Sequence, residues 1–199
     1  AEIIQSKGVE KIRFCATSAT RDASNRSIFI DGVKEILGVE PEVIPGTEEA
    51  RLSFIGATKE LKHSETPYLV VDIGGGSTEF VFGNEEVKYA KSVNIGCVRM
   101  SERHLKVQPP KPLDVQSAIA DIDEAIAEAS HIVPLKEAKT LIAVAGTATT
   151  VAAAALDLDR YDRNSIHLSR IPAQKVLEVA QKFQLASREE LAALGYMHP

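Results

Sequence analysis

The sequence predicts an α/β protein, because apolar strand-like runs alternate with helix-like segments along the chain. The apolar run at residues 12–16 precedes a segment at 28–37 with near-helical apolar spacing, which ends at Gly38, a typical helix stop. Two more apolar runs, 68–73 and 141–145, each lead directly into glycine and hydroxyl residues. Strands that end in such turns predict anion-binding loops.

A second strand and a second helix follow Gly38. Residues 42–44 predict a very short strand, Pro45-Gly46 predicts a turn, and Thr47 is a suitable N-cap for a helix that extends to about Lys62. The polar segment 62–67 ends in proline, which is typical of a crossing between domains. The predicted domains are residues 1–64 and residues 65–199.

The second predicted domain begins with a hairpin. Its extended segments, 68–73 and 78–82, are separated by a short glycine-rich turn, and residues 87–95 are a candidate third strand. Apolar residues spaced by four and three between Val115 and Val133 predict one amphipathic helix, which begins near Leu113.

The remaining segments are predicted to be a strand and helices. The strand at 141–145 enters Gly146-Thr-Ala-Thr-Thr150 and an alanine-rich helix. Two further helices are predicted, one with Pro172 in its first turn and one with a capping box formed by Ser187 and Glu190.

The composition is that of an ordinary globular protein. Of 199 residues, 44% are apolar and 26% are charged, and no apolar stretch approaches the roughly 20 residues that span a bilayer. The net charge of -5 argues against a nucleic-acid-coating or membrane-surface protein. Cys15 and Cys97 have no metal-binding spacing and are predicted to be reduced packing residues. A cytoplasmic enzyme fits these observations best.

The strongest functional signal is Asp72-Ile-Gly-Gly-Gly-Ser-Thr-Glu79, where an apolar strand breaks at three glycines and two hydroxyls and then resumes. Because glycine lacks a β-carbon, several backbone N–H groups in such a turn can converge on one anion, and the hydroxyls add donors. Asp72 can hold Mg²⁺, which offsets phosphate charge. The alternative is a hairpin stabilised by an aspartate turn. The turn residues are Gly74, Gly75, Gly76, Ser77 and Thr78.

Three weaker signals accompany this motif. Gly146-Thr-Ala-Thr-Thr150 opens a helix whose free N–H groups attract anions, although Thr147 can also serve only as an N-cap. Glu48 and Glu49 lie in a predicted first helical turn, where acidic residues usually just complement the helix dipole. Arg21, taken alone, is more often a surface arginine than a ligand.

Together, five segments resemble the ordered signature of the exopolyphosphatase and guanosine pentaphosphate phosphohydrolase family. The motifs are individually moderately specific, and their shared order and spacing carry the resemblance. It implies an actin-like ATPase (ribonuclease H-like) fold with two domains and an active site in the interdomain cleft. The segments are Ala16-Thr-Ser-Ala-Thr-Arg21, Pro45-Gly-Thr-Glu-Glu-Ala-Arg51, Asp72-Ile-Gly-Gly-Gly-Ser-Thr-Glu79, Asn94-Ile-Gly-Cys97 and Gly146-Thr-Ala-Thr149.

The resemblance also implies residue roles. Glu49 matches the family's catalytic base, which polarises a water for in-line attack on the terminal phosphorus. Glu79 would help position that water or the metal, and Arg21 would bind the phosphoryl group and stabilise transition-state charge. Asp72 would hold Mg²⁺. The residues implied to hold the phosphate are Gly74, Gly75, Gly76, Ser77, Thr78, Gly146 and Thr147.

The sequence departs from the family pattern at both ends. Family members open with a strand and a D-x-G-T/S-N-S-type phosphate loop, which does not precede Ala1, and a further strand and helix are expected after residue 199. We therefore expect the fold to be incomplete at both termini, so that residues 1–199 alone lack one wall of the phosphate site.

The predicted function is release of terminal orthophosphate from inorganic polyphosphate, guanosine pentaphosphate or both. The alternatives are an actin-like small-molecule kinase or ATPase, and a non-catalytic sensor of an alarmone or polyphosphate. No nucleic-acid or membrane partner is predicted, and the resemblance allows a homodimer without requiring one. A basic stripe could guide polyphosphate, although a solvated face is favoured. It contains Lys88, Lys91, Arg99, Arg103, Lys106 and Lys111.

Overall fold

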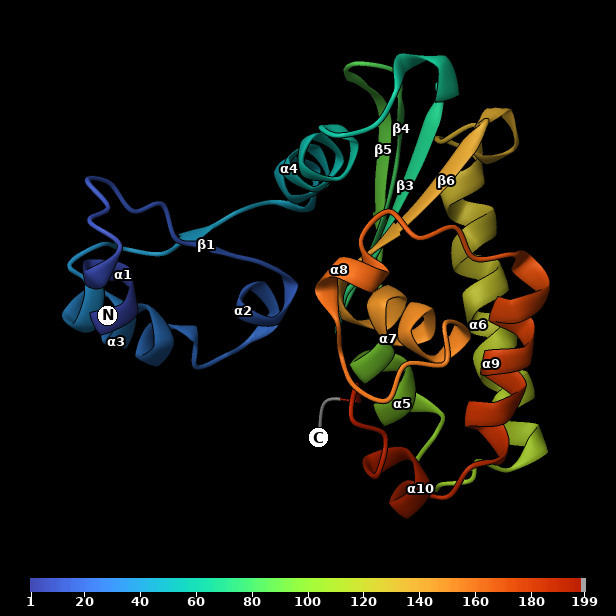
Figure 1. Cartoon of the computed structure of the whole chain (residues 1–199). Helices are drawn as coiled ribbons and strands as arrows, with labels where there is room; N and C mark the ends of the chain where they lie inside the picture. The colour runs from blue at the N-terminus through green and yellow to red at the C-terminus, as the bar shows by residue number, and fades with distance from the viewer. Residues whose placement is uncertain (198–199) are drawn as a thin grey trace.

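The computed structural model describes residues 1–197 and has the predicted α/β architecture (Figure 1). The first two strands form a parallel pair of only two residues each, in which Cys15 faces Glu42 and Ala16 faces Val43. The strand expected at 12–16 is therefore shorter than predicted, because pairing is limited to its last two residues. The N-terminal elements are α1 (Glu2–Ser6), β1 (Cys15–Ala16), α2 (Ser18–Asp22), α3 (Arg26–Leu37) and β2 (Glu42–Val43).

A mixed four-stranded sheet forms the centre of the fold, with strand order β5-β4-β3-β6. The predicted hairpin is confirmed, since β3 and β4 pair antiparallel, and β5 adds to β4 in the same way. β6 lies parallel to β3 on its other side. The strands are β3 (Tyr68–Ile73), β4 (Thr78–Gly83), β5 (Val87–Val93) and β6 (Thr140–Val144).

Helices cover both faces of this sheet. On one face α4 (Gly46–Thr58) buries Ala50 and Phe54 against Val70 and Val81. On the opposite face lie α5 (Cys97–Arg103) and α6 (Pro112–Ser130), as Figure 1 shows for α4 and α6. Because side chains alternate between the faces of a strand, the α4 face receives every second residue of the hairpin.

A third apolar cluster joins the helices that follow β6. It contains Ala153, Ile166, Val179 and Tyr196. The capping box at Ser187 is confirmed, with Ser187 and Glu190 exchanging side-chain-to-backbone hydrogen bonds. The short helix α8 was not predicted. The elements are α7 (Ala145–Ala155), α8 (Arg163–Ile166), α9 (Ala173–Leu185) and α10 (Arg188–Ala192), and two 3₁₀ turns lie at His63–Glu65 and Leu135–Glu137.

Two further expectations are wrong, namely the bounds of α4 and the packing role of Cys97. The α4 helix begins one residue before Thr47, with Pro45 at the N-cap, and it ends at Thr58 rather than near Lys62. Cys97 is exposed, because it begins α5 at the surface, so a packing role fits only the half-buried Cys15.

Within residues 1–197, no helix combines the length and apolarity needed to cross a membrane.

Candidate active site

A row of polar side chains crosses the sheet at the start of the glycine turn. Asp72 on β3 lies directly opposite Glu79 on β4, and Glu79 lies directly opposite Ser92 on β5. Directly opposed residues share one face of a sheet, and this is the face that α4 covers. The hairpin therefore brings both acidic residues of the motif together beneath α4.

Glu79 is almost completely enclosed, with 1% of its surface exposed. Ser92 Oγ donates a hydrogen bond to its Oε1 at 2.7 Å. Burial raises the pKa of Glu79; hydrogen bonds from Ser92 and Ser77 oppose this shift, and the negative charges of Glu49 and Asp72 reinforce it. Three carboxyl groups thus lie within electrostatic reach of one another.

Replacing Glu79 with glutamine is expected to raise the free energy of unfolding at neutral pH by on the order of 1 kcal/mol, because a penalised buried charge is removed. A carboxyl group whose pKa is raised by folding costs stability above that pKa, and the cost disappears as pH falls toward the unfolded-state pKa. The advantage of Glu79→Gln should therefore shrink as pH falls. Denaturant unfolding at several pH values measures it, and a variant less stable than the parent at neutral pH would contradict the prediction.

The α4 helix supplies two residues to this cluster. Ser53 Oγ donates a hydrogen bond of 2.6 Å to Asp72 Oδ2. Glu49 lies one helical turn before Ser53, so both residues are on the same side of α4. The helix that covers the acidic row therefore also fixes Asp72 and adds a third carboxylate.

Arg21 reaches this cluster from α2. Its Nη1 donates to Glu49 Oε2 at 3.1 Å and to the Ile44 carbonyl oxygen at 2.7 Å. Both side chains are only partly exposed, 26% for Arg21 and 17% for Glu49. Among the hydrogen bonds of residues 1–197, none uses Glu49 Oε1. This oxygen is therefore available to accept a hydrogen bond, or a proton, from a water molecule.

The carbonyl groups of the glycine turn accept hydrogen bonds from the backbone at the start of α5. The N–H of Cys97 donates to the Gly74 carbonyl, and those of Val98 and Arg99 donate to the Gly75 carbonyl, each at 3.0 Å. Within the described residues, the N–H groups of Gly75, Gly76 and Ser77 have no protein acceptor. Such free N–H groups at a turn are the chemistry that binds a phosphate oxygen.

Residues of α2 and α5 enclose Gly76. A β-carbon built on Gly76 would lie 2.8 Å from Ser18 Oγ, so the start of α2 touches the turn. Arg99 Nε donates to the Gly76 carbonyl oxygen at 2.6 Å, and its Nη2 pairs with Asp22. The turn is therefore linked to α2 as well as to α5.

The second predicted loop lies beside the first. Asp72 pairs with Val144 in the parallel β3–β6 ladder, so the two strands end at the same edge of the sheet. The α7 helix begins at Ala145, whose φ of 72° lies in the left-handed region. Val144 occupies the N-cap position and makes no side-chain capping bond. Thr147 is therefore not an N-cap. It lies inside the first turn of α7, directly after the exposed Gly146.

The donors for a metal are few. Among residues 1–197, no group of three or more His, Cys, Asp or Glu side chains has an arrangement that could hold an ion. The chemistry of Asp72 nevertheless suits a hard cation, because Mg²⁺ in phosphate sites often takes only one or two carboxylates and completes its shell with water and substrate oxygens.

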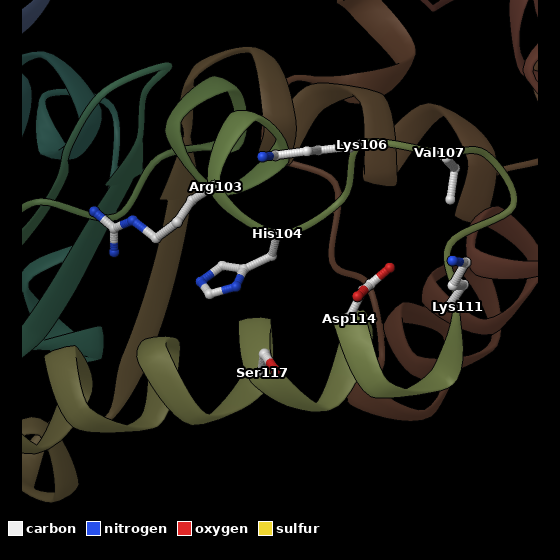
Figure 2. A pocket seen from close by; sticks show the side chains of 7 residues that line it. All are labelled: Arg103, His104, Lys106, Val107, Lys111, Asp114 and Ser117. Atoms are coloured by element: carbon white, nitrogen blue, oxygen red, sulfur yellow. The ribbon is translucent and has the colours of Figure 1, made fainter.

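Three of the six residues of the basic stripe, Lys91, Arg99 and Arg103, pair with acids. A hollow of about 350 Å³ lies between α5 and α6, and Figure 2 shows the side chains that line it. Asp121 on α6 accepts a hydrogen bond from Arg103 Nη1 at 2.6 Å and lies 2.8 Å from His104 Nε2, and these partners lower its pKa. Lys91 pairs with Glu128 at 2.6 Å. These pairs favour the solvated-face interpretation. The hollow is lined by Arg103, His104, Lys106, Val107, Lys111, Asp114 and Ser117.

Comparisons with known proteins identify the family of this chain. The model of the Ppx/GppA phosphatase family matches residues 1–199. The chain belongs to this family. Among curated proteins, exopolyphosphatase 2 of Mycobacterium tuberculosis is 44% identical over 204 residues, which cover all of this chain and 64% of that protein. A guanosine-5'-triphosphate,3'-diphosphate pyrophosphatase of Photobacterium profundum is 42% identical over 107 residues, 53% of this chain and 21% of that protein.

Solved structures of family members have the same fold. An exopolyphosphatase-like protein superposes with a TM-score of 0.95 at 45% identity, covering 100% of this chain and 64% of that chain. The Ppx/GppA family member of Aquifex aeolicus superposes with a TM-score of 0.78 at 29% identity, covering 96% and 61%. The chain thus spans somewhat less than two thirds of the length of these relatives.

Sequence reasoning missed the residues that support the site. Ser53, Ser92 and Ser18 contact the predicted residues, yet none stands out by residue type. Arg99, which bonds to the Gly76 carbonyl group, was noted only as part of the basic stripe. Ser18 lies inside one of the recognised segments, whereas the signal for Ser92 was only its place in the third predicted strand. Their contacts depend on packing between elements far apart in sequence.

Proposed function

We propose that this chain carries the active site of a phosphohydrolase that releases terminal orthophosphate from inorganic polyphosphate, guanosine pentaphosphate or both. The observation that carries the proposal is the meeting of Glu49, Asp72 and Glu79 beside a glycine turn with free N–H groups. The names of the mycobacterial and Photobacterium relatives support the two substrates.

In the proposed reaction, water attacks the terminal phosphorus while the bond to the bridging oxygen breaks on the opposite side. Glu49 Oε1 accepts the proton of the water, and Arg21, already beside Glu49, offsets charge on the phosphoryl oxygens. The N–H groups of Gly75 and Gly76 hold the phosphate. The free backbone N–H groups in the first turn of α7, at Gly146 and the residues after it, are a second set of donors. Positioning and electrostatics supply the catalysis, and no covalent nucleophile is needed.

Mg²⁺ is proposed at Asp72, whose carboxylate is fixed by Ser53, with Glu79 facing it across the hairpin. The bound ion would neutralise charge on the phosphate oxygens. The role of the protein side chains would be to orient the ion, because most of its ligands would be water and substrate oxygens.

The architecture proposed for the whole protein is actin-like, with two domains and the site in the cleft between them. The approach of Ser18 to Gly76 supports it, because it joins residues 1–64 to the second predicted domain at the glycine turn. The boundary at residues 64 and 65, the cytoplasmic location and a homodimer stay predictions.

Phosphate release tests the function directly. Full-length protein is incubated with Mg²⁺ and either polyphosphate or guanosine pentaphosphate, and orthophosphate is measured. We expect turnover of at least one substrate that EDTA abolishes. Consumption of ATP only with an acceptor would favour a kinase, and tight calorimetric binding without turnover would favour a sensor; either result contradicts the proposed hydrolase.

A further inference from the structure

A β-bulge decides which residue faces Glu79. The register between β4 and β5 shifts by one residue between Phe82 and Gly83. Gly83 pairs with Val87. If the ladder continued from this pair without a shift, Lys91 would lie opposite Glu79. With the shift Ser92 takes that place, and Lys91 lies opposite Phe80 on the other face of the sheet.

The Ser92 hydroxyl occupies a confined position. It donates to Glu79 Oε1 at 2.7 Å. On its other side is the first residue of α4, since a β-carbon built on Gly46 would lie 3.0 Å from Ser92 Cβ and 3.2 Å from its Oγ. Ser92 therefore lies between the buried carboxyl group and the start of the helix that carries Glu49.

We propose that Ser92 is a positioning residue for hydrolysis, whose hydroxyl holds the Glu79 carboxyl group in the orientation that the reacting water or the metal requires. Ser92 would not touch the substrate in this role, because it acts through Glu79. The inference rests on the proposed function. It parallels metal sites, in which residues that hydrogen-bond to a ligating side chain tune activity without binding the metal.

A hydroxyl that only satisfies a buried carboxyl group would affect stability alone. Positioning instead predicts a loss of kcat with little change in KM, because the ground-state phosphate contacts come from the glycine turn. It also predicts that the loss depends on the presence of the Glu79 carboxyl group, which a double-mutant cycle measures.

The experiment uses the full-length protein with Ser92→Ala, Glu79→Gln and the double variant, assayed for Mg²⁺-dependent phosphate release. We expect Ser92→Ala to lower kcat about tenfold, within the range seen for such supporting residues, with KM changed by less than about twofold. In the Glu79→Gln background, Ser92→Ala should cause no further loss. Ser117→Ala is the matched control, because its exposed hydroxyl bonds only to the Leu113 carbonyl within α6.

Unfolding midpoints of all variants are measured first. If Ser92→Ala is not folded at the assay temperature, Ser92→Cys, which keeps the branching of the side chain and weakens the donor, replaces it. A parent protein that hydrolyses neither substrate contradicts the proposed function and this inference with it. An active parent with unchanged kcat in the Ser92 variant, or with losses that multiply in the double variant, overturns this inference alone.

Discussion

Replacing Glu49 with glutamine is expected to lower kcat for phosphate release at least about 100-fold, because glutamine cannot take the proton of the attacking water. The side chain keeps its size, and its amide oxygen can still accept the hydrogen bond from Arg21 Nη1. The expected change in unfolding midpoint is therefore small, which separates a chemical role from a folding defect. Steady-state kinetics and thermal unfolding of the same preparations measure both.

The neighbouring Glu48 gives a matched control in the same helical turn. Its carboxylate is held by Arg51, through bonds of 2.8 and 3.0 Å, and this pairing lowers its pKa. Glu48→Gln removes the same charge from the start of α4 but leaves the acidic row intact. We expect its kcat to stay close to that of the parent, because this carboxylate pairs with Arg51 and not with the acidic row. Equal losses in both variants would show that the charge of the helix N-terminus matters rather than the base.

The part of the site that lies within one hairpin was predictable from the sequence. Asp72 and Glu79 flank a short turn, so their separation along the chain determines that they face each other. The same reasoning covers the second loop, because the strand before Gly146 is apolar and ends in the same kind of residues. Local signals were sufficient for these elements.

Contacts across the fold were not predictable in this way. Arg21 and Glu49 lie 28 positions apart, and no local pattern predicts that the Arg21 side chain on α2 reaches Glu49 on α4. The place of Ser92 depends on a one-residue register shift at Gly83, which residue alternation alone does not reveal. A shift of one residue moves each side chain to the other face, so an error at the bulge would have assigned Lys91 to the site.

The family resemblance supplied roles where single residues were ambiguous. Taken alone, Glu49 is predicted to complement a helix dipole, and Arg21 is predicted to be a surface arginine. Their contact in the structure gives a physical reason to consider them together. The roles themselves remain predictions that the kinetic experiments decide.

Replacing Gly96 with alanine is expected to lower kcat/KM about 100-fold, the scale of a misplacement of about 1 Å in an active site. A β-carbon on Gly96 would lie 2.5 Å from both the carbonyl carbon and the carbonyl oxygen of Gly75. These atoms are backbone, so no side-chain rotation can relieve the overlap. The turn or the start of α5 must move, and the N–H groups of Cys97 and Val98 would then lose their hold on the glycine carbonyls.

The same displacement should cost about 1–3 kcal/mol in the free energy of unfolding, as overpacking of a buried site usually does. Gly56→Ala is the control: Gly56 lies on α4, no atom lies within 4 Å of its added β-carbon, and alanine there should keep kcat/KM and raise stability slightly. Kinetics below the unfolding midpoints of all three proteins isolate the effect on the site. Because α5 orients the turn by bonding its carbonyl groups, a Gly96→Ala protein with normal kcat/KM would mean that the free N–H groups of Gly75 and Gly76 do not hold the phosphate.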